Sequence, residues 1–185
     1  MPKKPTASQI LRQLEKLHTE KPGRHPGAPT LQDTFYAEVK TGPTEWQARR
    51  GNAIQGAVKT NKGLLRLDAV AIKKSWTKPC FIGYEIKVSR SDFLRGRETA
   101  LCEYTKYCHK FSFVCPPDVI KISELPGDVG LIYYSPEHDC LFTKRRAMYR
   151  EIDLRSPEVV GMLMYLAMYR ANVNNSATLK AGENT

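Results

Sequence analysis

Paired cysteines, long hydrophobic runs and phosphate-binding glycine loops are all missing from this 185-residue sequence. Its five cysteines are odd in number and show no CxxC spacing, which argues against a disulfide framework or a zinc site. The longest apolar stretch, residues 159–171, is interrupted by Arg170 and is too short to span a bilayer. No apolar run follows the basic N-terminus, as a signal peptide would require. We therefore expect a cytoplasmic protein with free thiols and no membrane partner.

Acidic residues are scarce beside basic ones. The 29 Lys and Arg residues against 19 Asp and Glu residues give a formal net charge of +10. This surplus creates a long-range field that attracts polyanions, so nucleic acid is the favoured class of partner. Many small soluble proteins are also basic, so the charge only supports that interpretation. The length suits one domain over residues 1–185, with flexible tails at 1–7 and 173–185.

The hydrophobic pattern predicts a mixed α/β domain. Ser8 can cap a helix that runs to about Thr19, and a strand is expected over residues 34–40. Residues 64–72 and 80–88 are both strand-like, and the polar turn between them suits an antiparallel hairpin. The later expected elements are a helix capped by Ser89 or Ser91, strands at 110–115, 130–134 and 140–143, and a helix from Ser156 to about Ala171. This order favours a mixed β-sheet flanked by helices.

Residues suited to chemistry lie on the predicted hairpin. Side chains alternate between the faces of a strand, so Glu85 and Lys87 share a face, about 7 Å apart at ~3.4 Å per residue. The other face of this strand is apolar and is expected to be core, whereas Gly83 is expected to leave open space beside the charged pair. Asp68 alternates with apolar neighbours on the partner strand, and a hairpin that joins the apolar faces brings it beside Glu85.

Such a pair of carboxylates predicts a metal site. Two carboxylates in one cleft repel each other unless a cation lies between them, and a hard divalent ion with oxygen ligands is the usual solution. Mg²⁺ can lower the pKa of a bound water and neutralise charge on a phosphate oxygen. Lys87 can orient or activate that water, or stabilise the developing charge. The alternative is that Glu85 and Lys87 lie by chance on a solvated strand and that Asp68 is a surface group near a turn.

The motif Asp68…Glu85-x-Lys87 resembles that of the PD-(D/E)xK nuclease superfamily. Residues 84–94 (YEIKVSRSDFL) and the segment 107–116 are similar to bacterial and phage DNA-repair proteins of the MmcB type. This resemblance implies a restriction-endonuclease-like core, dependence on Mg²⁺ or Mn²⁺, and hydrolysis of phosphodiester bonds in DNA.

The same resemblance implies roles for single residues. Asp68 and Glu85 match the metal ligands of the superfamily, and Lys87 matches its catalytic lysine, so all three are expected to be catalytic. The similarity covers residues 34–135 and breaks at residues 96–98 (Gly-Arg-Glu), near which the family carries a lysine.

Further residues are expected to assist the site. Glu38 on a neighbouring strand and Glu15 on the first helix are candidates for an additional carboxylate, although ordinary solvated positions are the alternative for both. Basic residues are expected to contact DNA phosphates, which positions a substrate without reading its sequence. They come from a basic excursion at 44–62 and from the start of the helix after the motif, and they are Arg49, Arg50, Lys59, Lys62, Arg90, Arg95 and Arg97.

The sequence therefore predicts a metal-dependent DNA endonuclease or exonuclease for DNA repair, recombination or phage DNA processing. Two alternatives stay open: a non-catalytic nucleic-acid-binding protein on a nuclease fold, and an adaptor that binds another protein. Both do without the pairing of Asp68 with Glu85. The apolar residues of the last helix suit a core or a dimer surface, so a homodimer is a further expectation. Duplex, branched and single-stranded DNA are all open as substrates.

Overall fold

The computed structural model describes residues 5–20, 33–41, 65–73, 80–157 and 159–168. The chain divides into two compact units, Met1–Glu38 with Leu67–Ile152 and Val39–Arg66 with Asp153–Thr185. The residues of the hairpin motif all belong to the first unit. No linker in the sequence marks the division, and the single-domain organisation over residues 1–185 stays a prediction.

Helix α1 (Ala7–Thr19) begins with a reciprocal cap. The hydroxyl of Thr6 accepts a hydrogen bond from the backbone N–H of Gln9, and the side chain of Gln9 accepts one from the backbone N–H of Thr6. The cap is Thr6 rather than the predicted Ser8, because Gln9 stands at the position that closes the box with Thr6. Thr6 and Ala7 thus belong to the helix start, whereas residues 1–4 and 173–185 lie outside the described residues, so the flexible tails over 1–7 and 173–185 stay predictions.

In the described part of the chain, six strands form one mixed sheet in the order β1-β2-β3-β4-β5-β6. Their bounds are β1 Thr34–Thr41, β2 Leu65–Lys73, β3 Cys80–Ile86, β4 Lys110–Cys115, β5 Gly130–Ser135 and β6 Cys140–Arg145. β2 and β3 are antiparallel, as the hairpin pattern predicts, β3 to β5 run parallel, and β6 returns antiparallel to β5. The mixed α/β class is confirmed, whereas the restriction-endonuclease-like core stays a prediction.

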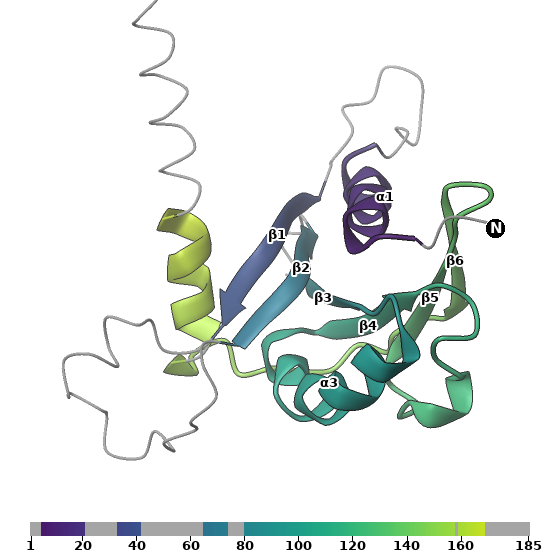
Figure 1. Ribbon diagram of the computed structural model, residues 1–185. Helices are drawn as coiled ribbons and strands as arrows, with labels where there is room; N and C mark the ends of the chain where they lie inside the picture. The colour runs from purple at the N-terminus through teal and green to yellow at the C-terminus, as the bar shows by residue number, and fades with distance from the viewer. Residues whose placement is uncertain (1–4, 21–32, 42–64, 74–79, 158, 169–185) are drawn as a thin grey trace, which may run out of the picture. The chain divides into compact units, whose positions relative to one another are not determined.

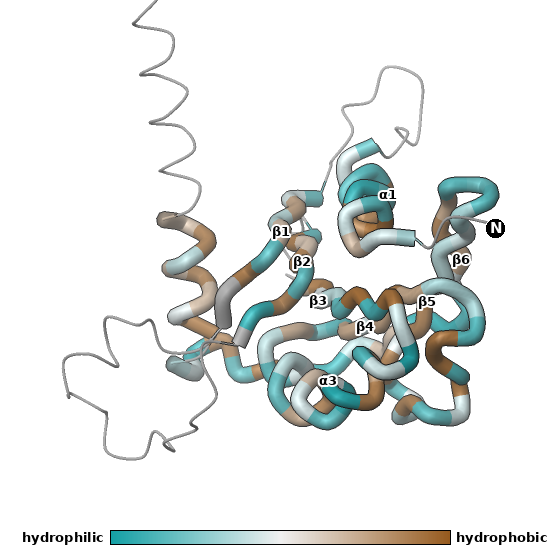
Figure 2. Tube along the Cα trace, viewed as in Figure 1, coloured by the Kyte–Doolittle hydropathy of each residue, from teal (hydrophilic) through white to brown (hydrophobic). Residues whose placement is uncertain are grey.

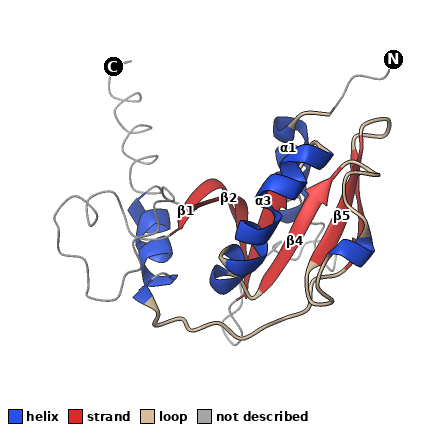
Figure 3. Cartoon of the chain, turned by 60° about the horizontal axis from the view of Figure 1, so that its bottom comes forward, coloured by secondary structure: helices blue, strands red, loops and turns tan. Residues whose placement is uncertain are grey.

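Helix α3 (Arg90–Cys102) lies in the connection between the parallel strands β3 and β4. It covers one face of the sheet while α1 covers the other (Figures 1 and 3). Such a crossover helix is what parallel neighbours need, because a tight turn cannot join them. Hydrophobic residues run along the strands between the two helices (Figure 2). The charged motif therefore has to lie on one of two covered faces.

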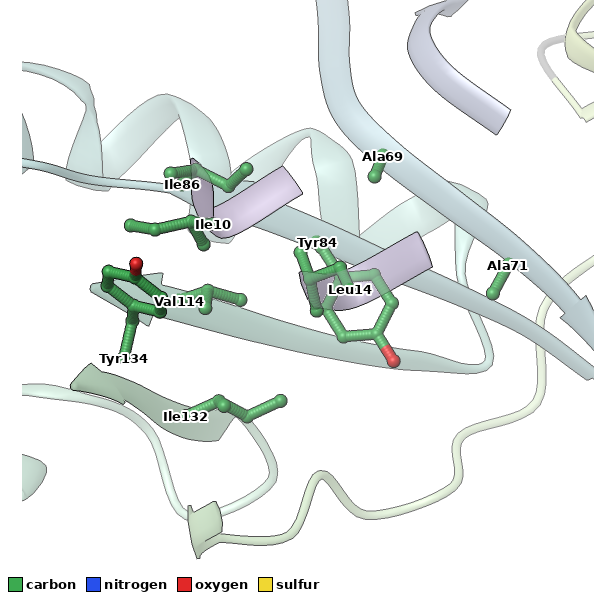
Figure 4. Packing of buried hydrophobic residues seen from close by; sticks show 9 residues of the cluster. All are labelled: Ile10, Leu14, Ala69, Ala71, Tyr84, Ile86, Val114, Ile132 and Tyr134. Carbon is green, nitrogen blue, oxygen red and sulfur yellow. The ribbon is translucent and has the colours of Figure 1, made fainter. Parts of the chain in front are cut away.

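The α1 face is an apolar core. Ile10 and Leu14 of α1 pack with Tyr84, Ile86 and Val114 of the central strands (Figure 4). On the α3 face, Phe93 packs edge-on against Phe113, with ring centroids 5.5 Å apart. Glu85 is paired with Phe113 in the parallel register of β3 and β4, and paired residues point to the same face. Glu85 therefore shares the face of the sheet that α3 covers.

The remaining sequence expectations concern the C-terminal helix, the thiols and the membrane. Residues 159–168 are helical within the second unit and bury Val159, Met162 and Leu166, while the predicted end near Ala171 lies outside the described residues. The five cysteines, all within the described ranges, are free, as predicted. No helix in those ranges is long and apolar enough to cross a membrane.

Candidate functional site

The β2–β3 hairpin places Asp68 beside Glu85. Ala69 pairs with Tyr84 in the antiparallel register, so the next pair in the same register is Asp68 with Glu85. The backbone N–H of Ile86 donates a hydrogen bond of 2.7 Å to Oδ2 of Asp68. The predicted alternation of β2 is observed, since Leu67 and Ala69 are fully buried while Arg66 is exposed. Asp68 and Glu85 thus share a face, as the apolar pattern of the two strands predicts.

Glu85 and Lys87 form a buried ion pair. Nζ of Lys87 lies 2.9 Å from Oε1 of Glu85, and Lys87 and Glu85 are only 7% and 6% exposed, respectively. Lys87 follows the last residue of β3, but its backbone N–H still donates to the carbonyl of Val114 over 2.9 Å, which continues the pairing with β4. The pair therefore does not lie on a solvated strand, whereas its functional role stays a prediction.

A second carboxylate reaches Lys87 from helix α3. Ser89 caps this helix by accepting a hydrogen bond from the backbone N–H of Asp92, so Asp92 stands in the first helical turn. Its Oδ2 lies 3.6 Å from Nζ of Lys87, and its Oδ1 lies 3.2 Å from Nη2 of Arg95. The sequence pattern identified Asp92 only as an acidic residue that favours a helix start. Its helical phase relative to Ser89 is what turns its side chain toward the end of β3.

The electrostatics of the cluster shift Glu85 toward its protonated form. Burial, followed by the negative charge of Asp68, raises the pKa of Glu85 from 4.5 to about 7, although Lys87 acts in the opposite direction. Burial alone would lower the pKa of Lys87, but the carboxylates of Glu85, Asp92 and Asp68 outweigh it and raise that pKa. The lysine therefore stays an ammonium ion at neutral pH.

One oxygen of this cluster has no partner. Oε2 of Glu85 is buried and accepts no hydrogen bond in the described structure, whereas Oε1 is bound to Lys87. A buried carboxylate oxygen without a donor is costly, and it fits a site where a cation supplies the missing interaction. Among the described residues, no three His, Cys, Asp or Glu side chains are grouped so that they alone could hold a metal ion. Asp68 and Glu85 fit a hydrated divalent ion that takes its other ligands from water or substrate.

The two further carboxylate candidates, Glu15 and Glu38, are both exposed. Glu15 is exposed on α1, which packs on the sheet face opposite to that of Glu85, so the structure does not bring it to the cluster. Glu38 is exposed on β1 and has a positive φ of 51°, which breaks the regular alternation of that strand. A metal role for Glu38 stays a prediction.

The predicted DNA-contacting residues on α3 are described, and those of the excursion are not. Arg90 forms a bidentate ion pair with Glu124. The hydrogen bond from this arginine lowers the pKa of Glu124 from 4.5 to about 2. The side chain of Arg95 is 80% exposed. The guanidinium carbon of Arg97 lies 5.9 Å from the ring centroid of Phe93. Arg95 and Arg97 thus remain on the surface near the cluster. The other four predicted contacts lie outside the described residues: Arg49, Arg50, Lys59 and Lys62.

One sequence expectation about β3 is wrong. Gly83 leaves no open space, because a Cβ there would lie 2.3 Å from Sγ of Cys108. The face opposite to Glu85 is core, as expected, but it also holds a polar contact, because the buried hydroxyl of Tyr84 lies 2.7 Å from Nε2 of His18. Nδ1 of the same histidine lies 2.8 Å from Oδ2 of Asp33. This polar network was not predicted, since its three members are brought together only by the packing of α1.

Comparison with known proteins indicates a similar fold but no activity. No protein-family model matches this chain, and no curated protein matches it. Among solved structures, a protein of unknown function from Silicibacter pomeroyi is similar over 98% of this chain and 94% of its own length. The TM-score is 0.55 and the sequence identity is 16%, so the similarity indicates a shared fold alone.

Proposed function

We propose that this chain is a metal-dependent nuclease that hydrolyses phosphodiester bonds in DNA. The observation that carries the proposal is the buried Oε2 of Glu85, which has no partner and lies on the same face as Asp68. A carboxylate that served only as the partner of Lys87 would gain from a donor on its second oxygen, because a buried acceptor without a hydrogen bond costs free energy. The motif resemblance and the net charge of +10 favour a phosphodiester as the substrate.

Each residue of the cluster has a role in this proposal. Asp68 and Glu85 would hold Mg²⁺ or Mn²⁺, which when bound activates a water and neutralises charge on the phosphate. The hydrogen bond from Ile86 to Asp68 fixes the orientation of that carboxylate beside the end of β3. The Lys87 ammonium lies beside Glu85 and is suited to orient the attacking water or to stabilise the charge that develops on the phosphate. Exposed Arg95 and Arg97 would position the DNA backbone.

A second candidate is a nucleic-acid-binding protein without catalysis. It is favoured by the near-complete burial of Glu85 and Lys87, which neutralise each other in the absence of any ligand. In that case the basic residues alone would account for binding. The two candidates differ in one measurable property, which is the dependence of strand cleavage on Glu85 and on a divalent ion.

The test uses the full chain with plasmid DNA and with single-stranded DNA, in Mg²⁺, in Mn²⁺ and in chelator. We expect cleavage in one or both metals, none in chelator, and a loss of about 100-fold or more in the Glu85→Gln variant. Glu98→Gln is the matched control, because Glu98 is an exposed glutamate on α3. Binding of DNA in chelator without cleavage in either metal would favour the second candidate. Cleavage by Glu85→Gln at the wild-type rate would refute the proposed site.

A further inference from the structure

The Lys87 ammonium is held from two different elements. Glu85 approaches it from β3, with Oε1 at 2.9 Å from Nζ, and Asp92 approaches it from α3, with Oδ2 at 3.6 Å. A lysine side chain is a flexible four-carbon stem, so a single partner leaves its ammonium several positions. Two carboxylates from different elements restrict it to one.

Helix α3 also provides the space in which the ammonium lies. Gly96 is four residues after Asp92, so the two share one face of the helix. A Cβ at residue 96 would lie 3.0 Å from Nζ and 3.5 Å from Cε of Lys87. Glycine in a helix interior is less favourable than alanine, and the backbone of Gly96 is not in the left-handed region that would require it. The missing side chain at this position leaves room for the ammonium.

We propose that Asp92 and Gly96 form a seat on α3 that fixes the Lys87 ammonium beside Glu85, and that Asp92 is a positioning residue of the site. The catalytic consequence rests on the proposed nuclease function, whereas the seat itself does not. A group that acts on the attacking water must be held in place, because a displacement of about 1 Å can lower a rate by about 100-fold. Asp92 also supports the helix start and pairs with Arg95, so its action on Lys87 has to be separated from a structural role.

Asp92→Asn is the central variant. Glu98→Gln is its control, because it removes one carboxylate charge from an exposed position of the same helix. We expect Asp92→Asn to lower kcat by about 10-fold or more with KM within about twofold, and Glu98→Gln to retain kcat. In a Lys87→Ala background, Asp92→Asn should have no further effect, since it acts through the lysine. Equal losses in Asp92→Asn and Glu98→Gln, or an undiminished loss in the Lys87→Ala background, would overturn the proposal.

Gly96→Ala distinguishes an effect on the position of the Lys87 ammonium from an effect on the stability of the helix. The new methyl group would displace the ammonium by a few tenths of an ångström, so we expect kcat to fall by roughly threefold to tenfold. The melting temperature should rise at the same time, because alanine favours a helix interior over glycine. A lower melting temperature with unchanged kcat would contradict the assignment of Gly96.

A readout independent of cleavage distinguishes failure of the seat from failure of the nuclease proposal. The rate at which an amine-reactive acylating reagent labels Lys87 in the folded protein is measured by peptide mass spectrometry. Only the deprotonated amine is acylated, so the ammonium must first lose its proton and leave the carboxylates that hold it. Asp92→Asn should therefore be labelled at least about threefold faster than wild type, and Glu98→Gln at the wild-type rate. If no variant cleaves DNA but this difference is found, the seat stands and the nuclease proposal fails. Equal labelling of wild type and Asp92→Asn overturns the seat, whatever the cleavage result.

Discussion

Replacement of Glu85 by glutamine should change how the stability of the fold depends on pH. The carboxyl group of Glu85 has its pKa raised from 4.5 to about 7, first by burial and then by Asp68. Because the folded state binds this proton more tightly than the unfolded chain, the resulting stability is fully present below pH 4.5 and is lost as pH rises through 7. A rise of this size corresponds to about 3 kcal/mol of unfolding free energy. A glutamine side chain binds no such proton, so this contribution would be absent from the Glu85→Gln variant.

The measurement is urea unfolding followed by far-UV circular dichroism at about pH 4.5, 6 and 8 in chelator. The free energy of unfolding of wild type minus that of Glu85→Gln should fall by about 3 kcal/mol from the lowest to the highest pH, since contributions of groups that do not interact with Glu85 cancel in the difference. The same difference for the exposed control Glu98→Gln should stay flat. Mg²⁺ at the highest pH should stabilise wild type and leave Glu85→Gln unchanged, because only an ionised Glu85 can serve as a ligand.

Two outcomes would refute this reasoning. A flat difference between wild type and Glu85→Gln would mean that burial and Asp68 do not act on this carboxyl group. A difference that rises with pH would mean that the ion pair with Lys87 outweighs both, and the pKa of Glu85 is then lowered. In either case Oε2 would not be the strained, unsatisfied oxygen on which the metal proposal depends.

Four further outcomes follow from the arrangement. Asp68→Asn should lose metal-dependent cleavage by about 100-fold or more while its circular dichroism spectrum is unchanged; full activity would remove the residue from the site. Residues 38–40 (Glu-Val-Lys) on β1 form a second Glu-x-Lys run. Lys87→Ala should cost far more cleavage activity than Lys40→Ala, and the reverse order would mean that the site belongs to β1 rather than β3. DNA affinity in chelator should fall with salt with a slope of about −4 to −5 for roughly four to six phosphate contacts, and a flat dependence would argue against backbone-led binding. Tyr84→Phe should lower the unfolding free energy by about 1–3 kcal/mol through the lost contact with His18, without an effect on cleavage; a large loss of activity would link the two faces of the sheet.

The hairpin was predictable because its information is local. Alternation along β2 and β3 fixes which side chains share a face, and the joining of their apolar faces then places Asp68 beside Glu85. The start of α1 was locally encoded as well. Both Thr6 and Ser8 carry a hydroxyl, but only Thr6 is followed by a glutamine at the third helical position, and that spacing decides the cap.

Contacts between distant elements were not predictable from such patterns. His18, Asp33 and Tyr84 meet because α1 packs on the sheet, and the histidine is 66 residues from the tyrosine. The contact of Asp92 with Lys87 is closer in sequence but depends on how α3 leaves the end of β3. A sequence pattern gives the face of a single element, whereas the angle at which two elements meet is set by the packing of both.

Burial changes the weight of the Glu-x-Lys pattern. On a solvated strand the pair Glu85 and Lys87 would contribute little to stability and would carry no functional meaning. In this fold the pair is almost fully covered, and a buried ion pair is often no more stabilising than apolar residues of similar volume. The cluster adds Asp68 to this pair and leaves Oε2 without a donor, which increases its cost to the fold. Groups that are retained at a cost to folding, with a pKa displaced toward neutrality, are typical of sites that act on a ligand. The physical case for function therefore rests on the unfavourable energetics of Glu85 more than on the motif to which it belongs.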